Sequence, residues 1–191
     1  MSTKYNPLNV VSAIVGMSSV KRFHGRETIK VQTIADHSCR AAQISFFLAM
    51  EFYSGDTEKA NSVSVLTLWH DFPESLLECD VPTHVKNMGS VGKELKAAEK
   101  LFVNNLFPDD PYLQNLMLEE APREDFNLMK LADYLDFGFY VKNEVSLGNK
   151  RFEEFLLWFQ KGLTKFPQDV LDLPTAQASI EFILCQQTKS I

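Results

Sequence analysis

Apolar residues recur along this chain at intervals of three and four, which is the spacing of one face of an α-helix. The pattern predicts helices over about 7–20, 33–52, 57–70, 90–107, 110–120, 124–147, 151–166 and 174–188. Asn6 and Pro7 suit the N-cap and first position of the first helix. No strand-length alternating run, internal repeat or low-complexity linker competes with this series, so the pattern predicts an all-α fold.

The segments between the first helices are polar and short. Residues 21–30 form a basic stretch broken by Gly25, which predicts a loop, and residues 54–56 predict a turn. Asp80-Val81-Pro82-Thr83 predicts a second turn after the short segment 75–79. With 191 residues, 45% of them hydrophobic, the chain is long enough to bury one full core. We therefore predict a compact helical bundle with one domain over residues 1–191.

Composition narrows the fold class and the partners. Fifteen Phe, five Tyr and two Trp supply core material, whereas eight Gly and eight Pro are few for an all-β fold. A net charge of -6 argues against a nucleic-acid polymer or an anionic membrane as the main partner. Three cysteines without a C-x-x-C pair indicate neither a disulfide framework nor a cysteine zinc site. We expect a cytoplasmic protein, in the host cytoplasm if a phage encodes it.

The segment His70-Asp71-Phe72-Pro73-Glu74 is the most informative part of the sequence. His70 and Asp71 can both reach an ion beside their helix, and Glu74 lies on the same face, where it can act on bound water. A structural explanation competes with this one. Asp71 can be the N-cap of a new helix, with Pro73 in its first turn and Glu74 closing a capping box. That explanation accounts for the carboxylates but not for the histidine.

Two residues elsewhere extend the candidate site. His37 lies one turn into the predicted helix 33–52, and Asp133 is a carboxylate in a strongly apolar helical stretch. A salt bridge to Lys130, or plain exposure, would explain Asp133 if it stood alone. Together His37, His70, Asp71 and Asp133 form a mixed nitrogen and oxygen ligand set from three helices. Such a set suits a divalent transition metal, namely Mn, Fe, Co, Ni or Zn.

This order of one His, a later His-Asp pair and a distant helical Asp resembles the HD-domain metal-dependent phosphohydrolases. Within that superfamily the chain resembles the bacterial 5'-deoxynucleotidases and the short phage deoxynucleoside triphosphate hydrolases, including those that act on dATP. The matching segments are Arg22-Phe23, residues 33–38, residues 70–74, Asp80-Val81-Pro82-Thr83 with Lys86, and residues 129–133.

The resemblance implies a role for each matching residue. His37, His70, Asp71 and Asp133 would hold the metal ion and, with it, the substrate phosphate. Glu74 would be the nearby carboxylate that orients the reacting groups or donates a proton during phosphate transfer. Arg22 would hold the phosphate. Phe23, where the deoxynucleotidases usually have Trp, would pack on the nucleoside. The substrate contacts would be completed by Asp80, Val81, Pro82, Thr83 and Lys86, with Asp80 accepting the sugar 3'-hydroxyl. Asp36 replaces the usual Glu, and one additional residue separates His70 from Asp80.

The implied chemistry is in-line attack of metal-bound hydroxide on phosphorus, with Mg as an additional ion. The implied substrate is a 2'-deoxynucleoside 5'-phosphate with a purine base. A dATP triphosphohydrolase and a dAMP-type 5'-deoxynucleotidase would share this metal site, so both remain open. The positive charge of residues 21–30 favours triphosphates slightly, although a charged loop is more often simply solvated.

Three other functions remain open. One is a catalytically silent HD module that binds nucleotide as a sensor or assembly protein, and another is a structural all-α adaptor. The third is a phosphodiesterase for cyclic nucleotides or (p)ppGpp, against which the Arg22-Phe23 and 80–83 segments argue. The aromatic stretch 152–159 has more apolar coverage than one buried stripe requires. We therefore predict a homo-oligomer, at least a dimer.

Overall fold

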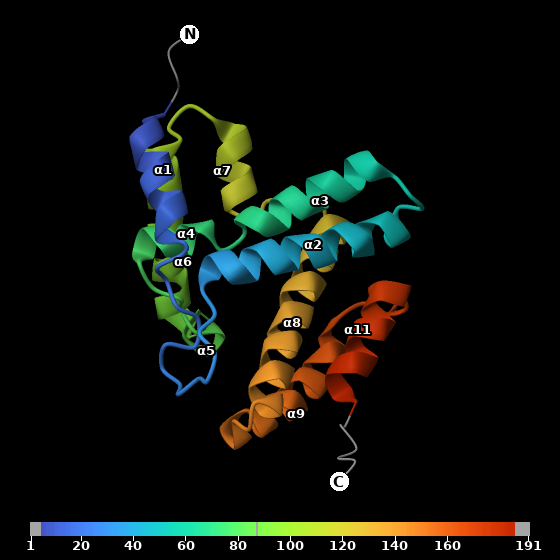
Figure 1. Cartoon of the computed structure of the whole chain (residues 1–191). Coiled ribbons are helices and arrows are strands. Elements are labelled where there is room, and N and C mark those ends of the chain that lie inside the picture. Colours follow the sequence, from blue (N-terminus) through green and yellow to red (C-terminus); the bar gives the residue numbers. More distant parts are fainter. Residues whose placement is uncertain (1–4, 87, 186–191) are drawn as a thin grey trace. The chain divides into compact units, whose positions relative to one another are not determined.

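The computed structural model describes residues 5–86 and 88–185. Its helices are α1 (Pro7–Gly16), α2 (Ile34–Phe52), α3 (Thr57–Trp69), α4 (Phe72–Leu77), α5 (Thr83–Lys86), α6 (Gly89–Leu106), α7 (Pro111–Met117), α8 (Arg123–Ser146), η1 (Lys150–Phe152), α9 (Glu153–Gly162), η2 (Leu163–Lys165), α10 (Gln168–Leu171) and α11 (Pro174–Leu184) (Figure 1). Between the described residues the only β-pairing is an isolated bridge from Lys21 to Thr33. The predicted all-α fold is confirmed.

Most predicted helices agree with the structure to within a few residues. The long stretch 124–147 is α8, and 90–107 is α6. Some local differences stand out. The single helix predicted over 151–166 is divided into η1, α9 and η2. In addition, α5 and α10 have no counterpart among the predicted helices, and α4 was predicted only by the capping explanation for Asp71. The end of the last predicted helix, 186–188, lies outside the described residues. No helix among the described residues is long and apolar enough to cross a membrane.

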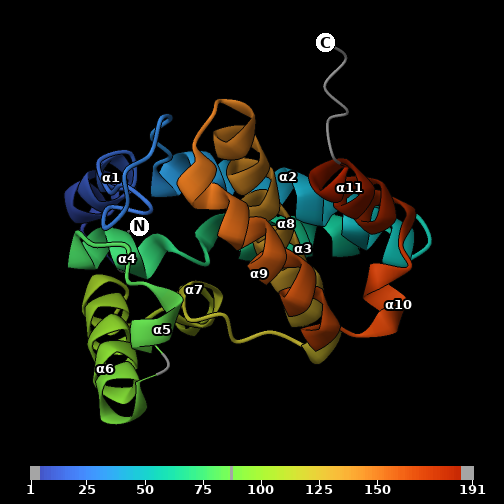
Figure 2. The same ribbon diagram turned by 90° about the horizontal axis from the view of Figure 1, so that it is seen from below.

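The described residues group into two compact units, and α2 and α3 contribute residues to both. The first unit takes in the described parts of Met1–Glu27, Val31–Cys39 and Leu68–Pro122. In it α4 packs against both α1 and α6 (Figure 2). Its core consists of Ala13, Met17, Val20, Ile34, Phe72, Val103, Leu106, Phe107 and Met117. The predicted cap of α1 is present, because the Asn6 side chain accepts the Leu8 N–H at 3.0 Å.

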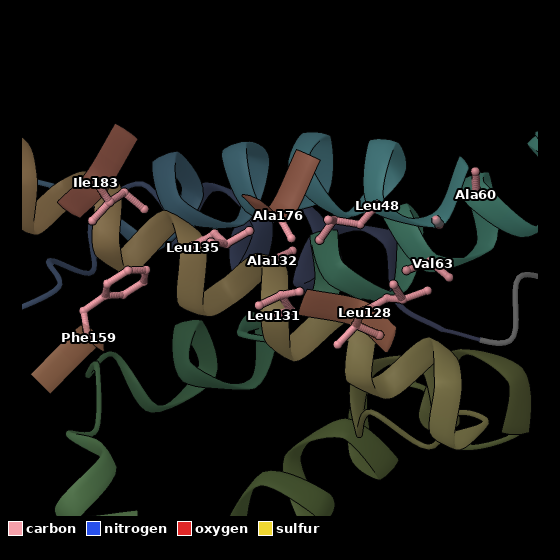
Figure 3. Close-up of a cluster of buried hydrophobic side chains, with 12 residues drawn as sticks. Leu48, Ala60, Val63, Leu128, Leu131, Ala132, Leu135, Phe159, Ala176 and Ile183 are labelled. Carbon is pink, nitrogen blue, oxygen red and sulfur yellow. The ribbon is translucent and has the colours of Figure 1, made fainter. Parts of the chain in front are cut away.

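The second unit comprises Thr28–Lys30, Arg40–Thr67 and the described part of Arg123–Ile191. Its core side chains converge from several helices, with α8 supplying Leu128, Leu131, Ala132 and Leu135 (Figure 3). The Ser64 hydroxyl donates to the Ala42 carbonyl at 2.9 Å and so joins α3 to α2. The single domain expected over residues 1–191 stays a prediction.

A buried carboxylate in this second unit holds the short segment Thr28–Lys30. Glu144 is fully buried and accepts the N–H groups of Ile29 at 2.8 Å and Lys30 at 2.7 Å. The Asn149 amide donates to the same carboxylate at 2.7 Å, and the Tyr140 hydroxyl donates to the Lys30 carbonyl at 2.7 Å. These bonds compensate the desolvation of the charge and fix part of the predicted loop.

Candidate metal centre

The first half of the site lies at the junction between α3 and α4, where the chain leaves one helix and starts the next. Asp71 occupies the N-cap position of α4 and Pro73 its first turn. The Asp71 side chain, however, makes no capping hydrogen bond. The carboxylate is turned towards His70, with 3.4 Å between Oδ2 and Nε2. The structural explanation from capping is therefore wrong for the Asp71 side chain, although it describes the backbone correctly.

The second half of the site is His37 in the first turns of α2, and a capping box fixes the start of that helix. The Thr33 hydroxyl donates to Asp36 Oδ2 at 2.8 Å, and the Asp36 N–H donates to Thr33 Oγ1 at 3.2 Å. The Thr33 N–H also donates to Asp36 Oδ2, at 3.1 Å. Asp36, which replaces the usual Glu of the resembling enzymes, thus closes the box and sets the position of His37.

Three ligand atoms converge within the first unit. His37 Nε2 lies 3.4 Å from His70 Nε2 and 3.5 Å from Asp71 Oδ2, so with the His70–Asp71 distance the atoms form a nearly equilateral triangle. Both imidazoles are buried, and the Asp71 side chain is 15% exposed. A proton shared by the two ring nitrogens would satisfy only one pair of this triangle. A cation would satisfy all three atoms together.

The donor set fits a divalent transition metal ion. Nitrogen and carboxylate ligands bind such ions at about 2.0–2.2 Å, which places neighbouring ligand atoms about 3–3.5 Å apart. Two imidazoles and one carboxylate are typical ligands of zinc and of the neighbouring divalent metals. The local geometry thus supports the predicted roles of His37, His70 and Asp71 as ligands.

Glu74 lies one turn after Asp71 and forms an ion pair with Lys86 of α5. Its carboxylate is almost fully buried, and Oε2 has no hydrogen-bond partner among the described residues. Burial, and then the charge of Asp71, raise the pKa of the Glu74 carboxyl above its ordinary value, and Lys86 offsets part of this. Burial lowers the pKa of the Lys86 ammonium, but Glu74 and Asp71 raise it by more. Lys86, predicted to contact substrate, therefore contacts the predicted proton-transfer group.

The Arg22-Phe23 segment is anchored to two other parts of the first unit. The Arg22 N–H donates to the Gln32 carbonyl at 2.9 Å, and the Phe23 N–H donates to Asp80 Oδ2 at 3.1 Å. The Arg22 guanidinium carbon lies 5.8 Å from the centre of the Phe23 ring. Both side chains are half-buried. The predicted phosphate-binding residue and the predicted nucleoside-binding residue are thus neighbours, and Asp80 contacts the backbone of Phe23.

The other predicted substrate residues differ in their burial. Val81 is half-buried and Pro82 is exposed. Thr83 begins α5, and its side chain lies outside what the structure describes. In the second unit, Asp133 is half-buried on α8. The neighbouring Lys130 ammonium lies 5.5 Å from the centre of the Phe126 ring.

Sequence analysis missed one ion pair close in sequence to two predicted ligands. Arg40 Nε lies 2.7 Å from Asp136 Oδ1, and the Asp136 side chain is only 1% exposed. These residues follow His37 and Asp133 by three positions each, one turn further along α2 and α8. The spacing of three positions from a predicted ligand, found for both Arg40 and Asp136, was the sequence signal that could have indicated this ion pair.

Comparison with known proteins gives one family match. A family model described as 5'-deoxynucleotidase YfbR-like matches residues 9–177. A search of curated proteins found no match.

Three solved structures have a similar fold. A protein from Pyrococcus horikoshii OT3 is 20% identical, with a TM-score of 0.66, and the match covers 92% of this chain and 95% of that one. A conserved hypothetical protein from Pyrococcus furiosus is 21% identical, with a TM-score of 0.66 and coverages of 92% and 96%. An HD-domain phosphohydrolase from Listeria innocua is 15% identical, with a TM-score of 0.61 and coverages of 90% and 92%.

The helical fold, the His and His-Asp segments and the family match define an HD-domain metal-dependent phosphohydrolase. This confirms the resemblance found in the sequence. The chain belongs to the 5'-deoxynucleotidase YfbR-like family.

Proposed function

We propose that this protein hydrolyses 2'-deoxynucleoside 5'-phosphates with a purine base, using one divalent transition metal ion. The observation that carries the proposal is the convergence of His37, His70 and Asp71 on one point beside the buried Glu74. The family match supports a deoxynucleotide as the substrate class. We place this activity in the cytoplasm, the compartment favoured by three free cysteines.

We further propose that Asp133 supplies the fourth protein ligand. The support is its place in the order of motifs and its carboxylate, half-buried among the apolar residues of α8. An anionic ligand offsets part of the charge of a divalent ion. Metal content of Asp133→Asn, measured on purified protein against wild type, tests this assignment. Unchanged stoichiometry and affinity would remove Asp133 from the ligand set.

The bound ion would lower the pKa of a water molecule and stabilise negative charge on the phosphoryl oxygens. Three side chains would bind the phosphate, hold a proton and position the proton-holding group. Arg22 holds the phosphate, which its guanidinium can bind through two parallel N–H donors. Glu74 is suited to hold a proton, because its burial raises the pKa of the carboxyl and favours the protonated form. Lys86 keeps the Glu74 carboxyl group in position, because its ammonium donates to Glu74 Oε1.

The phosphate count of the substrate is the finer part of the proposal, and we favour triphosphates. Lys21, His24 and Arg26 are exposed beside Arg22 in sequence and can contact additional phosphates. Attack at the α-phosphorus of dATP would release triphosphate and deoxyadenosine, whereas attack on dAMP would release inorganic phosphate. The products therefore distinguish the two activities directly.

The deciding experiment is product analysis of metal-reconstituted protein with paired deoxy- and ribonucleoside mono- and triphosphates. Asp71→Ala is the inactive variant, and Glu120→Ala, which changes an exposed carboxylate of the same unit, is the matched control. Deoxynucleoside with triphosphate establishes a triphosphohydrolase. Deoxynucleoside with phosphate, from monophosphates only, establishes a 5'-deoxynucleotidase. No turnover with Mn, Co, Ni, Zn, Fe or Mg would overturn the proposal and favour a nucleotide sensor.

A further inference from the structure

Phe23 has a backbone conformation that a phenylalanine rarely adopts. Its φ is 57°, in the left-handed region, where the β-carbon crowds the following carbonyl. Such a conformation persists where surrounding contacts hold it, and strained residues cluster at functional sites and in turns. Among the described residues, Ser54, Glu78 and Glu119 also have a positive φ. Phe23 lies beside Arg22, the predicted phosphate-binding residue. The strained backbone is therefore at the residue whose ring, together with the neighbouring Arg22 side chain, is predicted to contact substrate.

A carboxylate distant in sequence accepts a hydrogen bond from the backbone of Phe23. Asp80 lies 57 positions after Phe23 and accepts its N–H on Oδ2 at 3.1 Å. Two backbone bonds flank this contact, from the Arg22 N–H to Gln32 and from the Arg26 N–H to the Phe23 carbonyl at 2.8 Å. Among these three bonds, the one to Asp80 is the bond made by a side chain, so a substitution can remove it while leaving the backbone chemistry unchanged.

We propose that Asp80 is a positioning residue, which holds Phe23 in its left-handed conformation and so places the Phe23 ring and the Arg22 guanidinium for substrate. This inference rests on the proposed function, and it adds to the sugar contact that the family resemblance implies for Asp80. One oxygen, Oδ2, binds the loop, which leaves Oδ1 to accept a hydroxyl of the substrate. A single carboxylate thus links recognition of the sugar to the placement of the ring and the guanidinium.

A substrate without the 3'-hydroxyl separates the two roles. We would measure kcat/KM for wild type and Asp80→Ala with dATP and dAMP and with their 2',3'-dideoxy analogues. If Asp80 only accepted the 3'-hydroxyl, both proteins would hydrolyse the dideoxy analogue equally well. The positioning role instead predicts that Asp80→Ala hydrolyses the dideoxy analogue at least about tenfold less efficiently, since loss of one bond to a charged acceptor corresponds to that scale.

A measurement without substrate tests the same bond. We would follow exchange of the Phe23 amide hydrogen by NMR in protein labelled with ¹⁵N-phenylalanine, with the peak assigned through Phe23→Tyr. Asp80→Ala should raise the exchange rate at least about tenfold, because the N–H loses its acceptor. Asp80→Asn keeps a carbonyl oxygen that can accept the same N–H and should stay close to wild type. Glu120→Ala should leave the rate unchanged.

Two results would overturn the positioning role. One is equal hydrolysis of the dideoxy analogue by wild type and Asp80→Ala, and the other is unchanged exchange of the Phe23 amide in Asp80→Ala. If Asp80→Ala does not fold, Asp80→Ser replaces it with the same expected results. The serine side chain is too short for its oxygen to reach the Phe23 N–H. If wild type hydrolyses no nucleotide, the proposed function fails, while amide exchange still decides whether Asp80 holds the loop.

Discussion

Gly162, at the end of α9, offers a stringent test of the packing in the second unit. Its φ of -71° and ψ of -21° are ordinary right-handed values that alanine adopts freely, so the backbone does not require glycine there. Space does. A β-carbon at this position would lie 1.9 Å from the hydroxyl oxygen of Tyr134 and 2.6 Å from its Cζ. That hydroxyl contacts the carbonyls of Trp158 at 2.9 Å and Phe159 at 3.1 Å.

The loss of stability in Gly162→Ala can be worked out from the contacts that Tyr134 would lose. Moving the ring costs roughly 1–3 kcal/mol of overpacking strain. The lost hydroxyl bond costs about 1 kcal/mol, and loss of the stack on Phe159, now 5.1 Å between centroids, about 0.5–1.5 kcal/mol. Alanine returns at most about 1 kcal/mol of helix propensity. We expect the free energy of unfolding to fall by about 2–4 kcal/mol, or Tm by roughly 5–15 °C.

Thermal and urea unfolding followed by circular dichroism would measure this effect. Gly16→Ala is the matched control, because a β-carbon there would lie 3.7 Å from the Ser75 carbonyl oxygen, at ordinary van der Waals distance. It should leave stability unchanged or raise it slightly. In the double variant with Tyr134→Phe, the combined loss should be smaller than the sum by about 1 kcal/mol, since each single variant loses the same hydroxyl bond and the double variant loses it only once. Gly162→Ala within about 0.5 kcal/mol of wild type would refute the reasoning.

Three further predictions concern the metal, a buried charge and assembly. His37→Ala should leave purified protein with far less than one metal ion per chain by mass spectrometry of the elements, and wild-type content would contradict its role as ligand. Glu144→Gln should lower the free energy of unfolding by about 1–3 kcal/mol in urea titrations, because charge-assisted bonds to two backbone N–H groups weaken; unchanged stability would count against them. Leu157 and Trp158 are 58% and 50% exposed on α9, so light scattering should show at least a dimer, and Leu157→Glu with Trp158→Glu should shift it towards monomer. A single-chain mass for wild type would refute the predicted oligomer.

Local signals in the sequence predicted a large part of this structure. Asn6 and Pro7 marked the start of α1, and apolar spacing located α6 and α8, because caps and periodicity act over a few neighbouring residues. The candidate site was proposed from residue type and order. The structure brings the His37, His70 and Asp71 atoms within 3.5 Å of one another, and their role as metal ligands stays a prediction.

The features that sequence analysis missed depend on distant contacts. The acceptor function of Glu144 depends on backbone N–H groups 114 and 115 positions away, and backbone groups leave no trace in a sequence pattern. The same holds for the Phe23 N–H, whose acceptor Asp80 lies 57 positions away. The division of 151–166 into η1, α9 and η2 likewise follows from packing, which changes a helix without changing its apolar spacing.

The triangle of His37, His70 and Asp71 also has a thermodynamic consequence. It joins the start of α2 to the junction of α3 and α4, segments 33 positions apart, and only the folded chain brings these three atoms within 3.5 Å. An ion that binds the folded chain and not the unfolded one stabilises it by about 2.7 kcal/mol at a concentration 100 times its Kd. A metal ion held by these three residues would therefore act as a reversible cross-link. Chelation should lower the melting temperature even of a variant that no longer turns over substrate, and the rise in melting temperature ranks candidate metals without any knowledge of the substrate.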